Sequence, residues 1–313
     1  MSKEFFTVDC HCHLYRNEKQ GWNGRAIYDR MDRGGTLEQL TRYMDETGVD
    51  QSWVINAWPT QGLIQAGEAR IPKDLTGEKL AEARAAVREE VGARLARAND
   101  WLCSTAALAP GRVVPLIGMD PFLGAEWMVR EMEDKYRKGA RGIKLIATWG
   151  EFYPNDKRMW PLYQKLIDLD LVILSHSGAS NTLFAVVGTD YASPRYWAEP
   201  LAAFPKLKLV LAHLGFHWAF GYGNREQDER LELCKKYPNV YFDLSQNLEL
   251  GYSGVEEDMI RRFGAERLVW ASDWHTHCAT FNLQGLRRSK LSAEEKRMIL
   301  GENARRLTNS KRG

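Results

Sequence analysis

The segment Asp9-Cys10-His11-Cys12-His13 carries two imidazole groups at a spacing that suits metal binding. It follows a short apolar run, Phe5-Phe6-Thr7-Val8, that is typical of a β-strand. Side chains two residues apart on a strand point the same way, so His11 and His13 are expected to project together from the end of that strand. Two imidazoles so placed begin a site for a divalent metal, and the rest of the chain must supply the other ligands.

Further residues able to do chemistry stand at or near the ends of later apolar runs. They are Lys144 in the fourth run, His176 after the fifth, His213 after the sixth and Asp273 after the eighth. The candidate metal ligands are His11, His13, His176 and Asp273. Three imidazoles and a carboxylate suit Zn²⁺ first, and also Mn²⁺ or Fe²⁺, with one position left open for water. Asp273 can accept a proton from that water, and His213 can act as the general acid or base.

The elements that must position these residues alternate along the chain. Apolar runs predict eight strands, over Phe5–Asp9, Gln51–Ala57, Arg112–Gly118, Gly142–Ala147, Leu171–Ser175, Leu207–His213, Asn239–Leu244 and Arg267–Asp273. Helical spacing predicts Thr36–Thr47, Gly77–Asn99 continuing towards Leu108, Ala125–Lys138, Asp156–Asp168, Ser193–Ala203, Arg225–Lys236, Val255–Phe263 and a capped helix from Ser292 to Leu307. This alternation is the signature of an α/β fold, the (β/α)8 TIM barrel, as one domain over residues 1–313.

Two connections are too long for plain loops between a strand and the next helix. They are Leu14–Gly35 after the first strand and Trp58–Thr76 after the second. Both leave from the carboxyl ends of strands, where barrels carry their chemistry, so they are expected to act as lids.

Charge and composition narrow the class of protein. The 43 basic and 41 acidic residues give a net charge of +2, which argues against a nucleic-acid or polyanion surface. No apolar run is long enough for a membrane span, and no signal peptide is visible. Five cysteines without paired CxxC spacing fit reduced thiols in a cytoplasmic protein. Cys10 and Cys12 are expected to face away from the histidines, behind the strand.

The motifs around these residues resemble the amidohydrolase-related family 2 of the amidohydrolase superfamily, which includes aminocarboxymuconate-semialdehyde decarboxylase, resorcylate decarboxylases, hydrolases and hydratases. The matching segments run in order along the whole chain: Asp9–His13, Gly142–Leu145, Ser175–Gly178, Ala212–Gly215, Ser272–Trp274 and Ile299–Leu307. The resemblance implies a distorted barrel with a metal at the carboxyl ends of its strands. It implies that the metal ligands are His11, His13, His176 and Asp273, and that the catalytic residue is His213. By analogy it also implies a small-molecule substrate and a homo-oligomer such as a dimer, with a hetero-oligomer as the alternative.

Several polar residues have two interpretations. Lys144 is expected to lie inside the barrel and hold a carboxylate; the alternative is contact with substrate, or with metal through a carbamate. Relatives often have a proline soon after the eighth-strand aspartate, but here Trp274, His275, Thr276 and His277 follow. His217, His275 and His277 are expected to be loop or substrate-contacting residues, and the alternative is a second metal site.

Aromatic and cationic residues near the strand ends suggest an apolar-walled pocket for a cyclic, aromatic or unsaturated acid. The candidate walls are Trp58, Trp149, Trp218 and Trp274, any of which can instead be ordinary packing. Asn56 is a candidate donor to the substrate. The candidate cations for a substrate carboxylate are Arg25, Arg30, Arg33 and Arg195, for which a solvated surface position is the alternative.

Four functions are compatible with this set of residues. The leading hypothesis is a metal-dependent hydrolase in which the bound water attacks a carbonyl-type carbon. The second is a nonoxidative decarboxylase of an aromatic or muconate-like acid, which would use the same ligands. The third is a dinuclear iron or manganese oxygenase, which requires two metals per subunit. The fourth is a non-catalytic partner subunit that keeps a structural metal.

Overall fold

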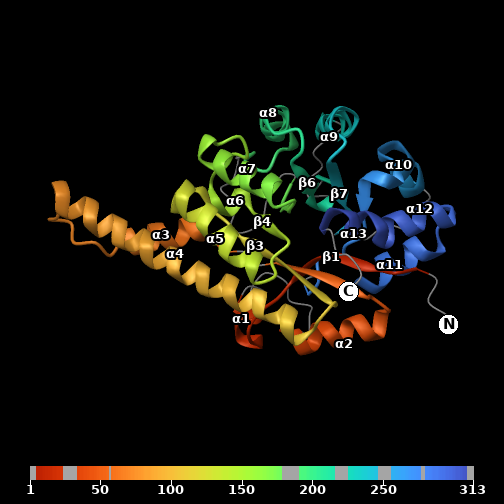
Figure 1. The fold of residues 1–313 in the computed structure, drawn as a ribbon, viewed down its shortest axis with the longest axis horizontal. Helices are drawn as coiled ribbons and strands as arrows, with labels where there is room; N and C mark the ends of the chain where they lie inside the picture. Colours follow the sequence, from red (N-terminus) through yellow and green to blue (C-terminus); the bar gives the residue numbers. More distant parts are fainter. Residues whose placement is uncertain are drawn as a thin grey trace.

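An eight-stranded parallel sheet forms the centre of the protein in the computed structural model (Figure 1), which describes residues 5–23, 34–55, 58–177, 190–215, 225–245, 255–275 and 279–308. Each strand pairs in parallel with the next one along the chain. The strands are β1 (Val8–His13), β2 (Gln51–Ile55), β3 (Val113–Gly118), β4 (Gly142–Leu145), β5 (Val172–Ser175), β6 (Lys208–Leu211), β7 (Val240–Asp243) and β8 (Leu268–Val269). The predicted TIM barrel is therefore confirmed.

Helices follow the strands and pack on the outside of the sheet (Figure 1). They are α1 (Glu18–Asn23), α2 (Leu37–Thr47), α3 (Thr60–Glu68), α4 (Gly77–Leu108), α5 (Ala125–Arg137), α6 (Ala147–Gly150), α7 (Trp160–Asp168), α8 (Ala198–Ala203), α9 (Arg225–Lys236), α10 (Val255–Phe263), α11 (Ala279–Arg288), α12 (Ala293–Arg297) and α13 (Asn303–Thr308). A π-helical turn over Met298–Glu302 joins α12 to α13. The capping box predicted at Ser292 is present, with Glu295 as its partner.

The core has two layers, as expected for strands buried on both faces. Alternate strand residues such as Val114, Leu174 and Val210 fill the inside of the barrel. The residues between them, such as Ile143 and Leu209, pack against the helices. This double burial explains why the strands are continuous apolar runs in the sequence.

A β-bulge in β1 sets the direction of the histidines. Asp9 pairs with Ser52 and Cys12 with Val54, so three steps along β1 match two steps along β2. The extra residue resets the alternation of side chains. Cys12 lies behind the strand, as expected. Cys10 was expected there too, but it lies in the core inside the barrel. The strand also continues through His13 rather than ending at Asp9, because pairing with β2 resumes after the bulge.

The barrel closes between its last and first strands through a seam of hydrogen bonds. β8 is only two residues long, whereas the sequence predicted a strand reaching Asp273. Cys10 N donates to Trp270 O at 3.1 Å, and the buried Asp9 carboxylate accepts from Ser272 N at 2.9 Å and from Ser272 Oγ at 2.5 Å. Regular pairing ends at Val269, and a single bridge between Cys12 and Trp274 follows Asp273, whose backbone lies in the left-handed region with φ 59°.

The segment after β2 forms an arm. The prediction that Trp58–Thr76 forms a lid is wrong beyond the first residues of this segment. The rest of the segment includes helix α3, which lies along α4, and the two helices project together from the barrel (Figure 1). Gly67 allows the close approach, since a Cβ there would lie 2.5 Å from Val87 Cγ1. Arg88 of α4 adds an ion pair to Glu68 of α3 at 3.4 Å.

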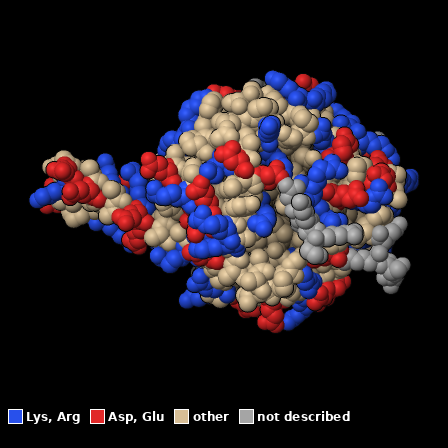
Figure 2. All heavy atoms as spheres, viewed as in Figure 1, with Lys and Arg blue, Asp and Glu red and all other residues tan. Residues whose placement is uncertain are grey.

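Basic and acidic side chains are interspersed over the face of the molecule in Figure 2, including the arm. This distribution matches the near balance of charges in the sequence. None of the helices in the described ranges combines the length and apolar composition that a bilayer crossing requires.

Candidate metal centre

Three of the four predicted ligands converge inside the barrel mouth. His11 and His13 lie on β1, and Asp273 follows β8 across the seam. Asp273 Oδ1 is 3.1 Å from His13 Nε2 and 3.4 Å from His11 Nε2. Metal–ligand bonds of about 2.0–2.2 Å at angles near 90–110° place ligand atoms roughly 3.0–3.5 Å apart. The three donors therefore fit a divalent metal ion in both chemistry and spacing.

Asp243, the last residue of β7, fixes the orientation of His11. Its Oδ2 lies 3.0 Å from His11 Nδ1. Burial alone would raise the pKa of Asp243, but hydrogen bonds and charge interactions with His11, His213 and Ser245 hold the pKa well below its usual range. An ionised carboxylate only accepts, so the ring hydrogen of His11 is on Nδ1. The lone pair of Nε2 then points towards Asp273, as a metal ligand requires.

The same carboxylate orients His213 through a serine. Ser245 Oγ is 2.5 Å from Asp243 Oδ1 and 2.8 Å from His213 Nδ1. Since the hydroxyl gives its one hydrogen to the carboxylate, it accepts the hydrogen of His213 Nδ1. His213 Nε2 lies 3.2 Å from His176 Nδ1 and accepts from it, which leaves the lone pair of the His176 ring on Nε2. One ionised aspartate thus sets the tautomers of three histidines.

His213 is held in an uncommon backbone conformation directly after β6. Its φ is 59°, a region that non-glycine residues rarely occupy. Its backbone N–H donates to Asp243 Oδ1 at 2.8 Å, which stabilises the turn. The ring stacks on His11 with centroids 5.2 Å apart. Burial lowers the pKa of His213 to about 3, although the carboxylates of Asp243 and Asp273 act in the opposite direction. The imidazole is therefore neutral at physiological pH.

Lys144 of β4 reaches the same cluster. Its Nζ lies 3.0 Å from His11 Nε2, so its hydrogen-bond partner is this histidine rather than the expected carboxylate. Burial lowers the pKa of Lys144 to about 8, while Asp243 and Asp273 act to raise it. The side chain is thus at the metal centre and is mostly cationic at neutral pH.

The other predicted ligands have different places. His176 follows β5 and faces His213, with ring centroids 5.0 Å apart. His275 is buried and packs at 6.5 Å from the ring of His13 and 5.1 Å from that of Tyr15. Within the described ranges, His275 belongs to neither group of converging donors. His217 and His277 lie outside the described residues.

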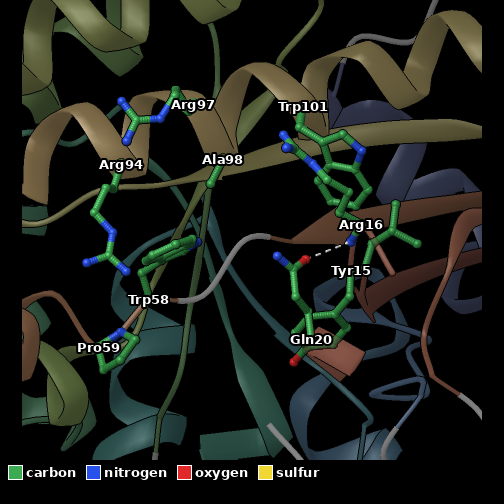
Figure 3. Close-up of a pocket in the computed structure, with 10 residues that line it drawn as sticks. Tyr15, Arg16, Gln20, Trp58, Pro59, Arg94, Arg97, Ala98 and Trp101 are labelled. Atoms are coloured by element: carbon green, nitrogen blue, oxygen red, sulfur yellow. Dashed lines mark hydrogen bonds between the residues drawn. The ribbon is translucent and has the colours of Figure 1, made fainter. Parts of the chain in front are cut away.

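A cavity of about 440 Å³ opens at Leu14 and Tyr15, the residues that follow His13 (Figure 3). It lies between α4, the segment after β1 and the start of the segment after β2, and among its lining residues are Tyr15, Arg16, Trp58, Arg94, Arg97 and Trp101. Trp58 thus lies on a pocket wall as predicted.

The remaining residues of the predicted pocket are distributed differently. Trp274 is fully buried and stacks on Tyr43 with centroids 5.6 Å apart, so its predicted place on a pocket wall is wrong. The turn at Asp273 directs it towards α2 instead. Trp149 lies in α6, and Arg195 forms a surface ion pair with Asp190. Outside the described residues are Arg25, Arg30, Arg33, Asn56 and Trp218.

A second, small cavity of about 10 Å³ lies between Trp58 and Lys144. Its lining includes Trp58, Asp120 and Lys144. Burial raises the pKa of Asp120 to about 7. The N–H of Phe122, the charge of Arg158 and the hydrogen bond with Thr60 act to lower this pKa, but burial has the larger effect. The folded protein consequently binds the Asp120 proton more tightly than the unfolded chain does.

We expect Asp120→Asn to stabilise the protein increasingly as pH rises. Between pH 4 and pH 7 the folded state keeps a proton that the unfolded state has lost, so the free energy of unfolding falls with pH in the wild type. Asparagine has no such titration, and its gain should reach about 2–4 kcal/mol at pH 8. Urea unfolding of both proteins from pH 4 to 8 measures the difference. A constant difference across this range would contradict the buried proton. Asp156→Asn is the control for which the stability difference should change with pH in the opposite direction, because Arg158 lowers the pKa of Asp156.

Some residues of the centre were not among the sequence-predicted candidates. Asp243 is the clearest case, since it closes the predicted seventh strand just as the histidines close others. Reading the polar residue at every strand end would have found it. Ser245 offers no comparable signal, because a serine two residues after a strand is ordinary loop composition. Arg94 and Arg97 sit in a helix rich in charged residues, where nothing in the pattern separates them from solvated neighbours.

Solved structures with the same fold include decarboxylases of aromatic acids. A 5-carboxyvanillate decarboxylase from Novosphingobium aromaticivorans, in complex with manganese and 4-hydroxy-3-methoxy-5-nitrobenzoic acid, matches with a TM-score of 0.72 and 17% identity over 99% of this chain and 97% of that one. A dihydroxybenzoic acid decarboxylase from Polaromonas, with bound manganese and 2-nitroresorcinol, matches with a TM-score of 0.69 and 15% identity over 99% and 98%. A 2,6-dihydroxybenzoate decarboxylase from Rhizobium matches with a TM-score of 0.64 and 17% identity over 97% and 99%.

At these identities the solved structures establish the fold. No curated protein matches the chain significantly. A family model does match, under the description Amidohydrolase, over residues 8–308. This range contains all the residues of the candidate metal centre, and it confirms the predicted superfamily and, at that level, the prediction of an enzyme. The chain belongs to the amidohydrolase family.

Proposed function

We propose that the protein is a metal-dependent, nonoxidative decarboxylase of an aromatic carboxylic acid. The observation that carries this proposal is a cavity lined by Trp58, Trp101 and three arginines, whose wall begins at Leu14, the residue next to His13 of the donor set. Flat aromatic walls and guanidinium groups suit an aromatic acid. The decarboxylases of aromatic acids among the proteins of the same fold add support. The decarboxylase, the second hypothesis from the sequence, therefore replaces the hydrolase as the favoured function.

Each residue of the centre has an assigned part in this proposal. The metal would be held by His11, His13, Asp273 and, through Nε2, His176. When bound, the metal supplies positive charge for the substrate carboxylate and an adjacent oxygen. Manganese is a candidate beside zinc, since two of the three solved structures described above hold it.

The reaction exchanges a carboxylate for a hydrogen. The carbon–carbon bond to the carboxylate breaks, carbon dioxide leaves with that carboxylate's carbon and oxygens, and the ring carbon keeps the electron pair and takes up a proton. We assign the handling of that proton to Asp273 and His213. His213 is neutral because burial lowers its pKa to about 3, and its Nε2 can accept a proton from a substrate hydroxyl when the hydrogen bond from His176 is given up. Lys144 contributes a positive charge within the same space.

Carbon dioxide release in deuterated water tests the proposal. The metal-loaded protein is incubated with hydroxybenzoates, carboxyvanillate and muconates, and we expect carbon dioxide together with a product that carries one deuterium at the vacated carbon. His213→Asn should lower the rate by at least about 100-fold while keeping the metal content. Turnover of lactones or amides without carbon dioxide would contradict the proposal. It would favour a hydrolase, which the family description and the same donor set make the second candidate.

A further inference from the structure

We propose that the cavity between α4 and the segment after β1 binds a second, distal carboxylate of the substrate through Arg16, Arg94 and Arg97. The favoured substrates are then extended aromatic dicarboxylic acids, with one carboxylate at the metal centre and the other among the arginines. This inference rests on the proposed function and specifies its substrate class.

The first support is the charge of the cavity. Arg94 and Arg97 are three residues apart on α4 and so lie on one face of the helix. In Figure 3 Arg94 extends from this helix to the side of Trp58, Arg97 lies along the helix above it, and Arg16 lies against Trp101. Within the ranges that the structure describes, none of these three guanidinium groups forms an ion pair with a carboxylate. Arg84 and Arg88, further towards the start of the same helix, both approach Glu68.

The second support is the shape of the cavity. Next to Arg97, α4 presents the small side chain of Ala98, which leaves room beside the indoles of Trp58 and Trp101. A volume of about 440 Å³ is within the range of sites for small organic ligands. Two indoles can cover the faces of an aromatic ring while the guanidinium groups bind a carboxylate at its edge.

The third support is that the cavity and the metal centre share walls. Tyr15 lines the cavity and packs on His275, which in turn packs on His13. On the other side, Trp58 lines both this cavity and the small inner cavity that contains Lys144. The cavity and the metal centre are therefore linked through Tyr15 on one side and Trp58 on the other.

Calorimetry on the metal-loaded protein tests the inference with a matched pair of probes. Biphenyl-4,4′-dicarboxylate has both carboxylates, and biphenyl-4-carboxylate lacks the distal one. The wild type should bind the diacid at least about tenfold more tightly, since charge-assisted hydrogen bonds to a second carboxylate add to the affinity. The double variant Arg94→Gln/Arg97→Gln should lose this preference.

The matched control is Arg70→Gln/Lys79→Gln, which removes the same charge from the arm. Both residues are exposed, and neither lines the cavity. This variant should keep the preference for the diacid. Equal affinity of the wild type for the two probes would overturn the inference, as would a preference that survives Arg94→Gln/Arg97→Gln.

The two proposals can fail separately. An arginine-dependent preference for the diacid, without carbon dioxide release from any acid of the panel, would leave the anion site in place and reject the decarboxylase. Carbon dioxide release from monoacids, together with equal binding of the two biphenyl probes, would reject the anion site alone.

Discussion

Replacing Asp273 by Asn is expected to abolish metal binding and turnover together. The carboxylate is the only anionic donor in the set that contains His11 and His13. An amide is a much weaker ligand than a carboxylate, so the metal content should fall from about one ion per chain to less than about a tenth of that. Loss of the metal removes several kcal/mol of transition-state stabilisation, which corresponds to a decrease of at least about 10³-fold in kcat.

Metal analysis after dialysis, together with initial rates, checks this result. Asp74→Asn, on an exposed loop before α4, is the control that changes the charge by the same amount and should match the wild type. Full metal content in Asp273→Asn would show that the three donors do not form the site. Normal metal content with low activity would restrict Asp273 to proton handling.

Replacing Asp243 by Asn should impair two histidines at once. The amide cannot accept from both His11 Nδ1 and Ser245 Oγ while also accepting the N–H of His213. The preference of His11 for the Nδ1–H tautomer is then lost, and we expect metal affinity to fall by about 10–100-fold. Turnover should fall by about 10²–10⁴-fold because His213 loses its fixed tautomer as well. The buried network should also lose roughly 3 kcal/mol of stability.

Ser245→Ala separates the effect of Asp243 on His11 from its effect on His213. It removes the link to His213 but leaves the contact between Asp243 and His11. Chelator competition should therefore give a smaller loss of metal affinity than in Asp243→Asn, because only His176 is affected, while kcat falls by about tenfold or more. Equal metal affinity in Asp243→Asn and Ser245→Ala would contradict the role of Asp243 in orienting His11.

The alternation of strands and helices, and the rim on which the chemistry lies, could be predicted from the sequence. Parallel strands buried on both faces leave long apolar runs, and a polar residue that ends such a run is easy to recognise. His11, His176, His213 and Asp273 were found in this way, and the structure brings them to one end of the barrel. The histidine is also a rare residue here, with seven copies, which made its placement informative.

The finer geometry could not be predicted because it depends on single backbone steps. The bulge in β1 adds one residue between Asp9 and Cys12, and no residue type in this segment predicts a bulge. The last strand pairs over only two residues, and the left-handed turn at Asp273 sends Trp274 into the core rather than into the pocket. The helix over Thr60–Glu68 has glycine and proline around it and few apolar residues, so its packing on α4 decides its structure more than its own propensity does.

The seam between β8 and β1 has a consequence for the order of barrel closure and metal binding during synthesis of the protein. The donor set joins the first strand of the barrel to a residue that follows the last one, and Asp9 contacts Ser272 across 263 positions of sequence. A nascent chain on the ribosome holds both histidines of β1 from the start but lacks Asp273 until nearly all of the barrel has been translated. We therefore expect metal capture by this set to follow barrel closure, and the bound ion to link the first strand of the barrel to the segment after the last one.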